Sequence, residues 1–231
     1  MIHRPLGTIE DMRDTYHEEL DALSDRLIEM TRLARHAIAR ATTALLDADL
    51  DAAQEVISGD EKLNTLNDEI ESSAMALMAR QQPVAQDLRT IITALHMSGD
   101  LERMGDHAVH IAKIARRRYP DSAIPAELRS IVLEMGHQAE MLVIKAGEVV
   151  ANRDVETARE LDKDDDRMDR LRRKLLERIL SSKWEYGVEA TMDVTLAGRF
   201  YERFGDHAVH VADNLVYLVT GERPKDSYGE G

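Results

Sequence analysis

The sequence predicts an all-α protein of six long helices, arranged as two tandem, pseudo-symmetric three-helix bundles. Aromatic residues make up only 4% of the chain while Ala, Leu, Met, Glu, Asp and Arg dominate, a composition typical of helical bundles. Apolar residues recur every three or four positions, and no long run of alternating β-branched residues indicates a sheet. A nine-residue segment also occurs twice, 100 positions apart, which indicates a duplicated fold.

The first half of the chain contains three predicted helices. Apolar or small residues at three- and four-residue spacing predict the first helix through residues 20–44. The second is expected at about 50–81, with these side chains facing inward: Val56, Leu63, Leu66, Ile70 and Leu77. Pro83 predicts the connection and first turn of a third helix over 84–118, because proline is tolerated at the first helical position. We therefore expect the first bundle to cover residues 8–119.

A polar segment with a proline at each end, residues 120–125, predicts the boundary between the halves. The helical periodicity then resumes and predicts three more helices: one through 132–149, one from near Asp154 and one over 188–220. The second bundle is expected to cover 125–220. Residues 221–231 are predicted to form a flexible tail.

Charge and composition exclude several classes of protein. The formal net charge is −14, which disfavours direct binding to nucleic acid because phosphate contacts need a basic face. It favours cations or basic protein surfaces as partners. The chain has no cysteine, which fits a reducing compartment. Residues 1–30 lack the apolar core of a signal peptide and no window is apolar enough to span a bilayer, so we expect a cytoplasmic protein.

The repeated segment reads Glu-Arg-x-Gly-Asp-His-Ala-Val-His and starts at Glu102 and again at Glu202. Each Glu follows apolar or uncharged residues at seven-residue spacing, which predicts that it lies on the core seam: Leu88, Leu95 and Glu102 in one half, and Val188, Thr195 and Glu202 in the other. The Asp four residues later lies about 40° further round the helix, so both carboxylates project from one side. The predicted acidic pairs are Glu102 with Asp106, and Glu202 with Asp206.

Carboxylates on a seam need compensation, because an unpaired one costs several kcal/mol in desolvation and two together repel. Arginine or lysine from a neighbouring helix could supply it, and so could a metal cation. Gly105 and Gly205 lie in the same turns, and each costs about 1 kcal/mol relative to Ala in a helix. They predict the close approach of another helix or a ligand.

The second helices of the two halves also align, which pairs Asp60 with Asp165 and Asn64 with Asp169. Asp60, Asp165 and Asp169 are therefore further candidate metal ligands. Carboxylate oxygens suit Mg, Mn or Fe and, together with imidazole, Zn. The spacing leaves open whether four histidines bind the metal, surround its ligands or lie at the surface: His107, His110, His207 and His210.

The segment 80–89, Arg-Gln-Gln-Pro-Val-Ala-Gln-Asp-Leu-Arg, followed by 100–108, Asp-Leu-Glu-Arg-Met-Gly-Asp-His-Ala, closely resembles the PhoU family of phosphate-signalling regulators. The second half keeps Glu-Arg-x-Gly-Asp but has Trp-Glu-Tyr-Gly at 184–187 in place of the proline segment. The resemblance implies two three-helix bundles whose Glu/Asp-xxx-Asp motifs bind iron or zinc, in some members as multinuclear clusters. It assigns metal ligation to Glu102, Asp106, Glu202 and Asp206, with Asp60, Asp165 and Asp169 as further candidates.

The resemblance also implies a function without catalysis. Members of the family act as negative regulators that link a phosphate ABC transporter to a sensor histidine kinase. This protein would then contact the transporter's ATPase subunit and the kinase at the cytoplasmic side of the membrane, as a homodimer. Two alternatives remain: a carboxylate-bridged metalloenzyme, disfavoured because neither motif contains Glu-xx-His, and a purely structural helical adaptor that binds no metal.

Overall fold

The computed structural model of the 231-residue chain describes residues 9–81, 83 and 85–222. Throughout these ranges the regular structure is helical, with six α-helices and one short 3₁₀ turn: α1 (Ile9–Asp47), α2 (Leu50–Gln81), α3 (Ala85–Arg118), η1 (Ala126–Leu128), α4 (Arg129–Asn152), α5 (Val155–Ile179) and α6 (Gly187–Thr220). The predicted all-α fold with six long helices is confirmed. Most of the predicted tail, 221–231, lies outside the described residues.

Local signals in the sequence set several of the helix ends. The carboxylate of Asp154 accepts hydrogen bonds from the backbone N–H groups of Glu156 and Thr157, both at 3.1 Å, and so caps α5. Gly221 ends α6 in a left-handed conformation with φ of 78°, as glycine commonly does. Pro83 lies before α3, which starts at Ala85, so its predicted place in the first turn was wrong. A residue without a backbone N–H is accommodated equally well just outside a helix.

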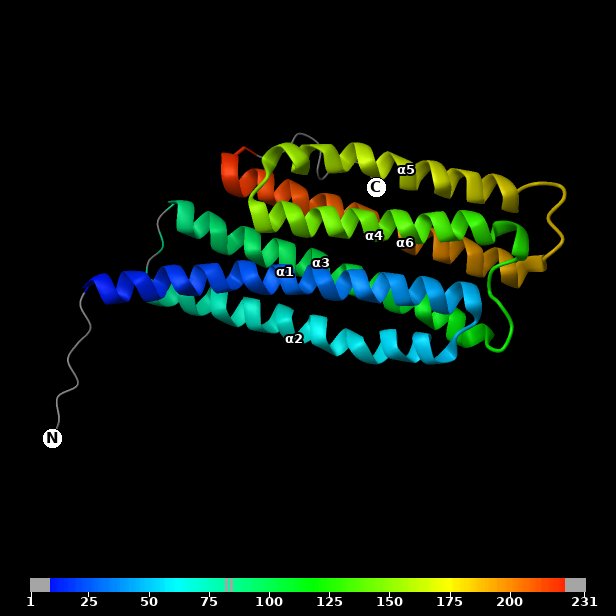
Figure 1. The fold of residues 1–231 in the computed structure, drawn as a ribbon, viewed down its shortest axis with the longest axis horizontal. Helices are drawn as coiled ribbons and strands as arrows, with labels where there is room; N and C mark the ends of the chain where they lie inside the picture. The colour runs from blue at the N-terminus through cyan, green and yellow to red at the C-terminus, as the bar shows by residue number, and fades with distance from the viewer. Residues whose placement is uncertain (1–8, 82, 84, 223–231) are drawn as a thin grey trace.

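The six helices run along one long axis, and each helix is antiparallel to the one before it (Figure 1). Helices α1, α3, α4 and α6 form the centre of the molecule, since α1 packs on α4 and α3 packs on α6. Helix α2 covers α1 and α3 on one side, and α5 covers α4 and α6 on the other. The two repeats therefore share one continuous hydrophobic core.

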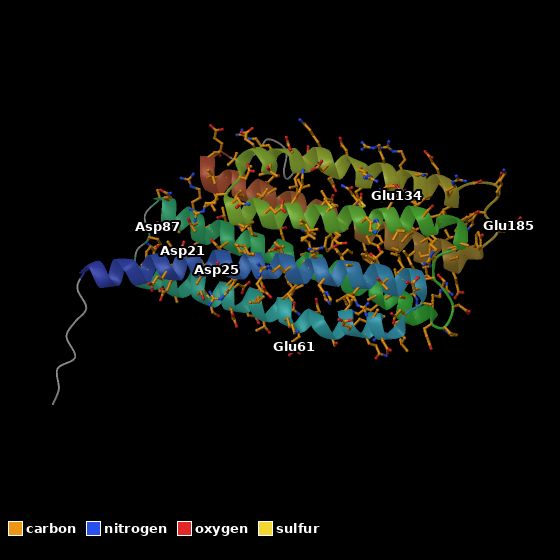
Figure 2. All side chains as sticks on the ribbon, in the orientation of Figure 1. Asp21, Asp25, Glu61, Asp87, Glu134 and Glu185 are labelled. Atoms are coloured by element: carbon orange, nitrogen blue, oxygen red, sulfur yellow. The ribbon has the colours of Figure 1, made fainter. Side chains whose placement is uncertain are left out.

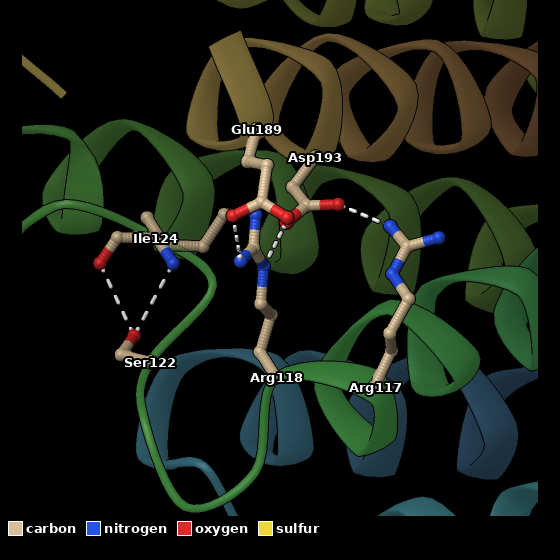
Figure 3. Close-up of polar contacts among 6 residues, drawn as sticks. All are labelled: Arg117, Arg118, Ser122, Ile124, Glu189 and Asp193. Atoms are coloured by element: carbon tan, nitrogen blue, oxygen red, sulfur yellow. Dashed lines mark hydrogen bonds and ion pairs between the residues drawn. The ribbon is translucent and has the colours of Figure 1, made fainter. Parts of the chain in front are cut away.

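The segment between the repeats is held in place more firmly than its polar composition predicts. Ala123 and Ile124 are both only 4% exposed and join the core. The hydroxyl of Ser122 donates to the carbonyl of Ile124 at 3.1 Å and accepts from its N–H at 3.2 Å. Figure 3 shows this turn beside the end of α3.

A group of ion pairs joins the two repeats at the same end of the molecule. Arg117 and Arg118, the last residues of α3, both bind the carboxylate of Asp193 on α6, whose side chain is 2% exposed. Arg118 Nη1 also donates to Glu189 Oε2 at 2.9 Å (Figure 3). A buried carboxylate with two guanidinium partners is well compensated, so this contact fixes the end of α3 against the start of α6.

The seams of the helices lie largely where the periodicity predicts, but strict seven-residue spacing fails over two heptads. Leu88 is 37% exposed and Val188 is 76% exposed, although both were expected on a seam. A straight α-helix drifts about 20° per heptad relative to a seven-residue repeat. The Glu side chains of the two motifs consequently lie at the edge of the core, Glu102 with 26% of its side chain exposed and Glu202 with 11%.

The glycine of each motif lies where the outer helix of its repeat touches the inner one. A Cβ added to Gly105 would lie 2.6 Å from Leu63 Cδ1 and 3.1 Å from Asp60 Oδ1, both on α2. A Cβ added to Gly205 would overlap Asp165 Oδ1 on α5. The predicted close approach of another helix is confirmed, and the same contacts place Asp60 and Asp165 at equivalent points over the two repeated turns.

We expect Gly205→Ala to lower the free energy of unfolding by about 1–3 kcal/mol, because the added methyl group must displace the Asp165 carboxylate or separate α5 from α6. Gly99→Ala is the matched control, since its Cβ meets nothing within 4 Å and should raise stability by about 0.5–1 kcal/mol through helix propensity. Urea unfolding in the presence of a chelator measures both. Equal stability of the two variants would contradict the close contact.

Candidate functional site

The second acidic cluster, defined as Asp165, Asp169, Glu202 and Asp206, forms where α5 meets α6. Asp165 Oδ1 is buried and has no hydrogen-bond partner among the described residues. Burial, together with the neighbouring charges of Asp206, Asp169, Asp162 and Glu202, raises the pKa of Asp165 to about 7. The structure thus brings the four predicted carboxylates of this half into one electrostatic cluster, to which sequence reasoning had not added Asp162.

Glu202 is the compensated member of this cluster. Arg199 Nη1 binds its Oε2, and Arg172 Nη1 lies 3.3 Å from its Oε1. Compensation by arginine, one of the two options left open by the sequence, therefore holds for this carboxylate. Asp206 is less well compensated. Burial and then the charge of Glu202 raise its pKa, and together they outweigh the opposing charge of Arg199. Asp165 and Asp206 are therefore the carboxylates of this cluster whose negative charge is least compensated.

The first acidic cluster, defined as Asp60, Glu102 and Asp106, occupies the equivalent place between α2 and α3. Asp60 Oδ1 is again buried without a hydrogen-bond partner among the described residues. Burial and then the charge of Asp106 raise the pKa of Asp60, while a hydrogen bond to Asn64 and the charge of Lys113 oppose the rise. Asp60 also lines a pocket of about 110 Å³ between α1, α2 and α3.

The motif residues of the first acidic cluster share a single arginine. Arg103 Nη1 donates to Asp106 Oδ2 at 3.4 Å, and Arg103 Nε lies 3.7 Å from Glu102 Oε2. Burial and then the charge of Asp106 still raise the pKa of Glu102. This long, exposed pairing leaves the cluster only partly neutralised.

One position near the motifs differs in charge between the two repeats. Lys113 lies near the first acidic cluster, whereas the equivalent position of the second half holds Asp213. Burial is the main cause that raises the pKa of Asp213 to about 6, and the charge of His210 opposes the rise.

The four histidines of the motifs lie at the contact between α3 and α6. The rings of His107 and His207 stack with their centroids 5.4 Å apart, and His110 stacks on Phe200 at 4.8 Å. Burial lowers the pKa of His107 to about 3, and neither of its ring nitrogens has a hydrogen-bond partner among the described residues. His107 is therefore a neutral packing residue.

Asp100, His207 and His210 form a more compact group of possible metal ligands than either acidic cluster. Within the described ranges, Asp100, His207 and His210 are the one set of three or more His, Asp or Glu side chains whose ligand atoms all lie within 4.8 Å of one another. The two acidic clusters are looser than this. Sequence reasoning missed Asp100 because it lies outside the repeated segment and only the packing of α3 on α6 brings it to the histidines.

The donor chemistry of the acidic clusters fits a metal cation. Each contains a buried carboxylate oxygen, Asp60 Oδ1 or Asp165 Oδ1, without a hydrogen-bond partner in the part of the chain that the structure describes, beside further carboxylates of raised pKa. Such groups favour either a bound proton or a bound hard cation. Asp169 is exposed on α5 and borders the second cluster.

The outside of the molecule is also acidic. Figure 2 labels six carboxylates that are spread over α1, α2, α3, α4 and the connection between α5 and α6: Asp21, Asp25, Glu61, Asp87, Glu134 and Glu185. This distribution accords with the net charge of −14. None of the helices in the described part of the chain is long and apolar enough to cross a membrane.

The PhoU domain family model matches this chain twice, over residues 27–115 and 132–215. The phosphate-specific transport system accessory protein PhoU homolog 2 of Mycobacterium tuberculosis is 50% identical over 213 residues, covering 92% of this chain and 100% of the relative. Homolog 1 of Mycobacterium leprae is 48% identical over 215 residues, with coverage of 93% and 97%.

Solved structures agree with the sequence relatives. PhoU from Pseudomonas aeruginosa superposes with a TM-score of 0.79 at 29% identity, covering 90% of this chain and 100% of that one. The phosphate transport system regulatory protein PhoU from Streptococcus pneumoniae gives 0.82 at 25% identity, with coverage of 91% and 99%. Both repeats, the fold and the motifs therefore agree, and the chain belongs to the PhoU family.

Proposed function

We propose that this protein is a non-enzymatic negative regulator of phosphate uptake that couples a phosphate ABC transporter to a sensor histidine kinase. The observation that carries the proposal is the 50% identity, over 92% of the chain, to a protein named as an accessory of the phosphate-specific transport system. The Streptococcus pneumoniae relative is named as a regulatory protein of phosphate transport. We expect the ATPase subunit of the transporter and the kinase to be the partners.

The proposed site of action is the cytoplasmic face of the membrane, reached through these partners rather than by insertion. The acidic exterior would steer association with basic surfaces on them, because complementary charge mainly sets encounter rate and specificity. We propose a homodimer as the assembly that binds. Nothing in this role requires a reacting group on the protein.

We propose further that the two acidic clusters bind iron or zinc. Asp165 and Asp206, with Glu202 and Asp169 beside them, would hold the cation of the second half. Asp60, Glu102 and Asp106 would hold that of the first. A bound cation would supply positive charge that replaces the proton on the raised carboxyls and would tie each outer helix to its inner neighbour, giving the partners a fixed surface.

One observation favours the alternative of a structural adaptor without metal. Arg172 and Arg199 already neutralise Glu202, so salt bridges satisfy part of the second cluster. They leave Asp165 Oδ1 without a hydrogen-bond partner from any residue that the structure describes. The state of Asp165 therefore distinguishes the two readings.

Loss of the protein should derepress phosphate uptake in phosphate-rich medium. We expect a strain lacking this gene and every other copy of the family to take up labelled phosphate several-fold faster than wild type at high phosphate, and the intact gene to restore repression. Asp165→Asn combined with Asp206→Asn should restore it incompletely. Asp166→Asn, at an exposed neighbouring position, is the matched control. Normal repression in the deletion strain would refute the proposed regulation.

The metal-free protein should lose stability as the pH rises. The folded-state pKa of Asp165 is about 7 against an ordinary value of 3.8, so the folded chain binds this proton more tightly than the unfolded chain. The stabilisation of the folded state that comes from protonated Asp165 is fully present below about pH 4 and is lost as the pH rises through 7. Urea unfolding of chelated protein from pH 4 to 8 should give a smaller loss for Asp165→Asn than for wild type.

Asp166→Asn again serves as the control and should keep the wild-type slope. Added zinc should restore stability most at the high end of this pH range, because the cation competes with protons for the carboxylates. Parallel curves for wild type and Asp165→Asn would mean that Asp165 has an ordinary pKa and does not need a cation.

A further inference from the structure

The contact between α3 and α6 brings the two repeated segments face to face. His107 on α3 and His207 on α6 stack at its centre, with centroids 5.4 Å apart. On the α3 side, His107 and His110 both stack against Phe200 of α6, at 5.9 and 4.8 Å. Two imidazoles from one repeat thus face a single residue of the other.

The two equivalent histidines on α6 face a different kind of residue on α3. His207 and His210 face Asp100 of α3, the position 100 residues before Phe200. His207 Nδ1 lies 3.0 Å and His210 Nδ1 lies 3.5 Å from Asp100 Oδ1. The local two-fold relation is therefore broken, with an aromatic ring on one side and a carboxylate on the other.

The distances among these three groups match those of metal ligands. Zinc bonds of about 2.0–2.1 Å in tetrahedral geometry place neighbouring ligand atoms about 3.3 Å apart. The two observed distances to Asp100 bracket that value, and all three ligand atoms lie within 4.8 Å of one another. Little rearrangement would be needed to admit an ion.

The surroundings support a bound cation as well. Asn214 Nδ2 donates to the carbonyl of His210 at 2.9 Å and lies 3.5 Å from Asp100 Oδ2, so it orients the carboxylate as residues behind metal ligands do. The side chains of Asp100 and His207 are 17% and 14% exposed, and that of His210 is 34% exposed. The group is thus largely enclosed, with His210 on its more open side.

We propose that Asp100, His207 and His210 form a transition-metal site that joins the first repeat to the second. Two imidazoles and one carboxylate suit Zn²⁺ or Fe²⁺, with a remaining position for water. The site differs from the acidic clusters in its imidazole donors and in joining helices of different repeats, while the charges of His207 and His210 also act on Asp206 of the second cluster. This inference goes beyond the proposed function and does not depend on it. The competing description is a histidine–carboxylate ion pair that binds no metal.

Cobalt titration tests the site, because Co²⁺ with imidazole ligands in a four-coordinate site absorbs visible light strongly, whereas six-coordinate carboxylate sites absorb weakly. We expect the full-length protein, stripped with a chelator, to develop this absorption as Co²⁺ is added and to lose it when Zn²⁺ is added. Asp100→Asn and His210→Gln should each weaken the affinity about tenfold or more.

Two controls locate the binding. His110→Gln removes the matching imidazole on α3, which faces Phe200, and should keep the absorption. Asp165→Asn alters the second acidic cluster and should also keep it. Circular dichroism checks that each variant remains helical, and His210→Gln, at the more open side, provides the second test if Asp100→Asn unfolds.

The proposal is overturned if the wild type shows no such absorption at micromolar cobalt, or if the absorption survives in folded Asp100→Asn or His210→Gln protein. It is also overturned if Asp165→Asn abolishes the absorption, since the histidines would then belong to the acidic cluster. None of these results bears on phosphate repression, which the deletion strain tests separately.

Discussion

A carboxylate pressed against the bare turn of a neighbouring helix is the constraint on which the rest of this structure depends. Gly205 leaves room for Asp165, and Gly105 leaves room for Asp60, because a Cβ at either position would crowd the outer helix. The close contact joins α5 to α6 and α2 to α3. It also removes water from one carboxylate oxygen in each repeat. The packing of the fold therefore makes ionisation of these two carboxylates unfavourable unless a positive charge or a proton compensates for the lost water.

The two repeats differ in how far neighbouring side chains compensate the charge of these carboxylates. In the second, Arg172 and Arg199 neutralise Glu202 but leave Asp165 with a pKa near 7. In the first, a hydrogen bond to Asn64 and the charge of Lys113 both favour ionised Asp60 and so limit the rise of its pKa. Asp193 shows that the protein can pair a buried carboxylate fully, because two arginines bind it between the repeats. Among the described residues, Asp60 Oδ1 and Asp165 Oδ1 have no such partner, and this contrast is why we propose a cation beside them.

Much of this structure could be predicted from the sequence, because helical periodicity and the spacing of prolines reflect local physics. The bounds of α2 and the start of α5 near Asp154, its N-cap, followed directly, and the alignment of Asp60 with Asp165 followed from the duplication. Strict heptad spacing was less reliable, as the exposure of Val188 shows. The partners of Glu202 and the meeting of Asp100 with His207 depend on how helices rotate against each other, which no local pattern contains.

The central claim is that the repeated acidic turns hold cations, and anomalous diffraction from crystals grown with zinc or iron tests it most directly. The account predicts an anomalous peak at bonding distance from Asp165 and Asp206, absent from crystals of Asp165→Asn. It allows a weaker peak beside Asp60, where Lys113 lowers the demand for a cation. A wild-type crystal with no anomalous density at Asp165, in which its Oδ1 atom binds only a proton or a water molecule, would contradict it.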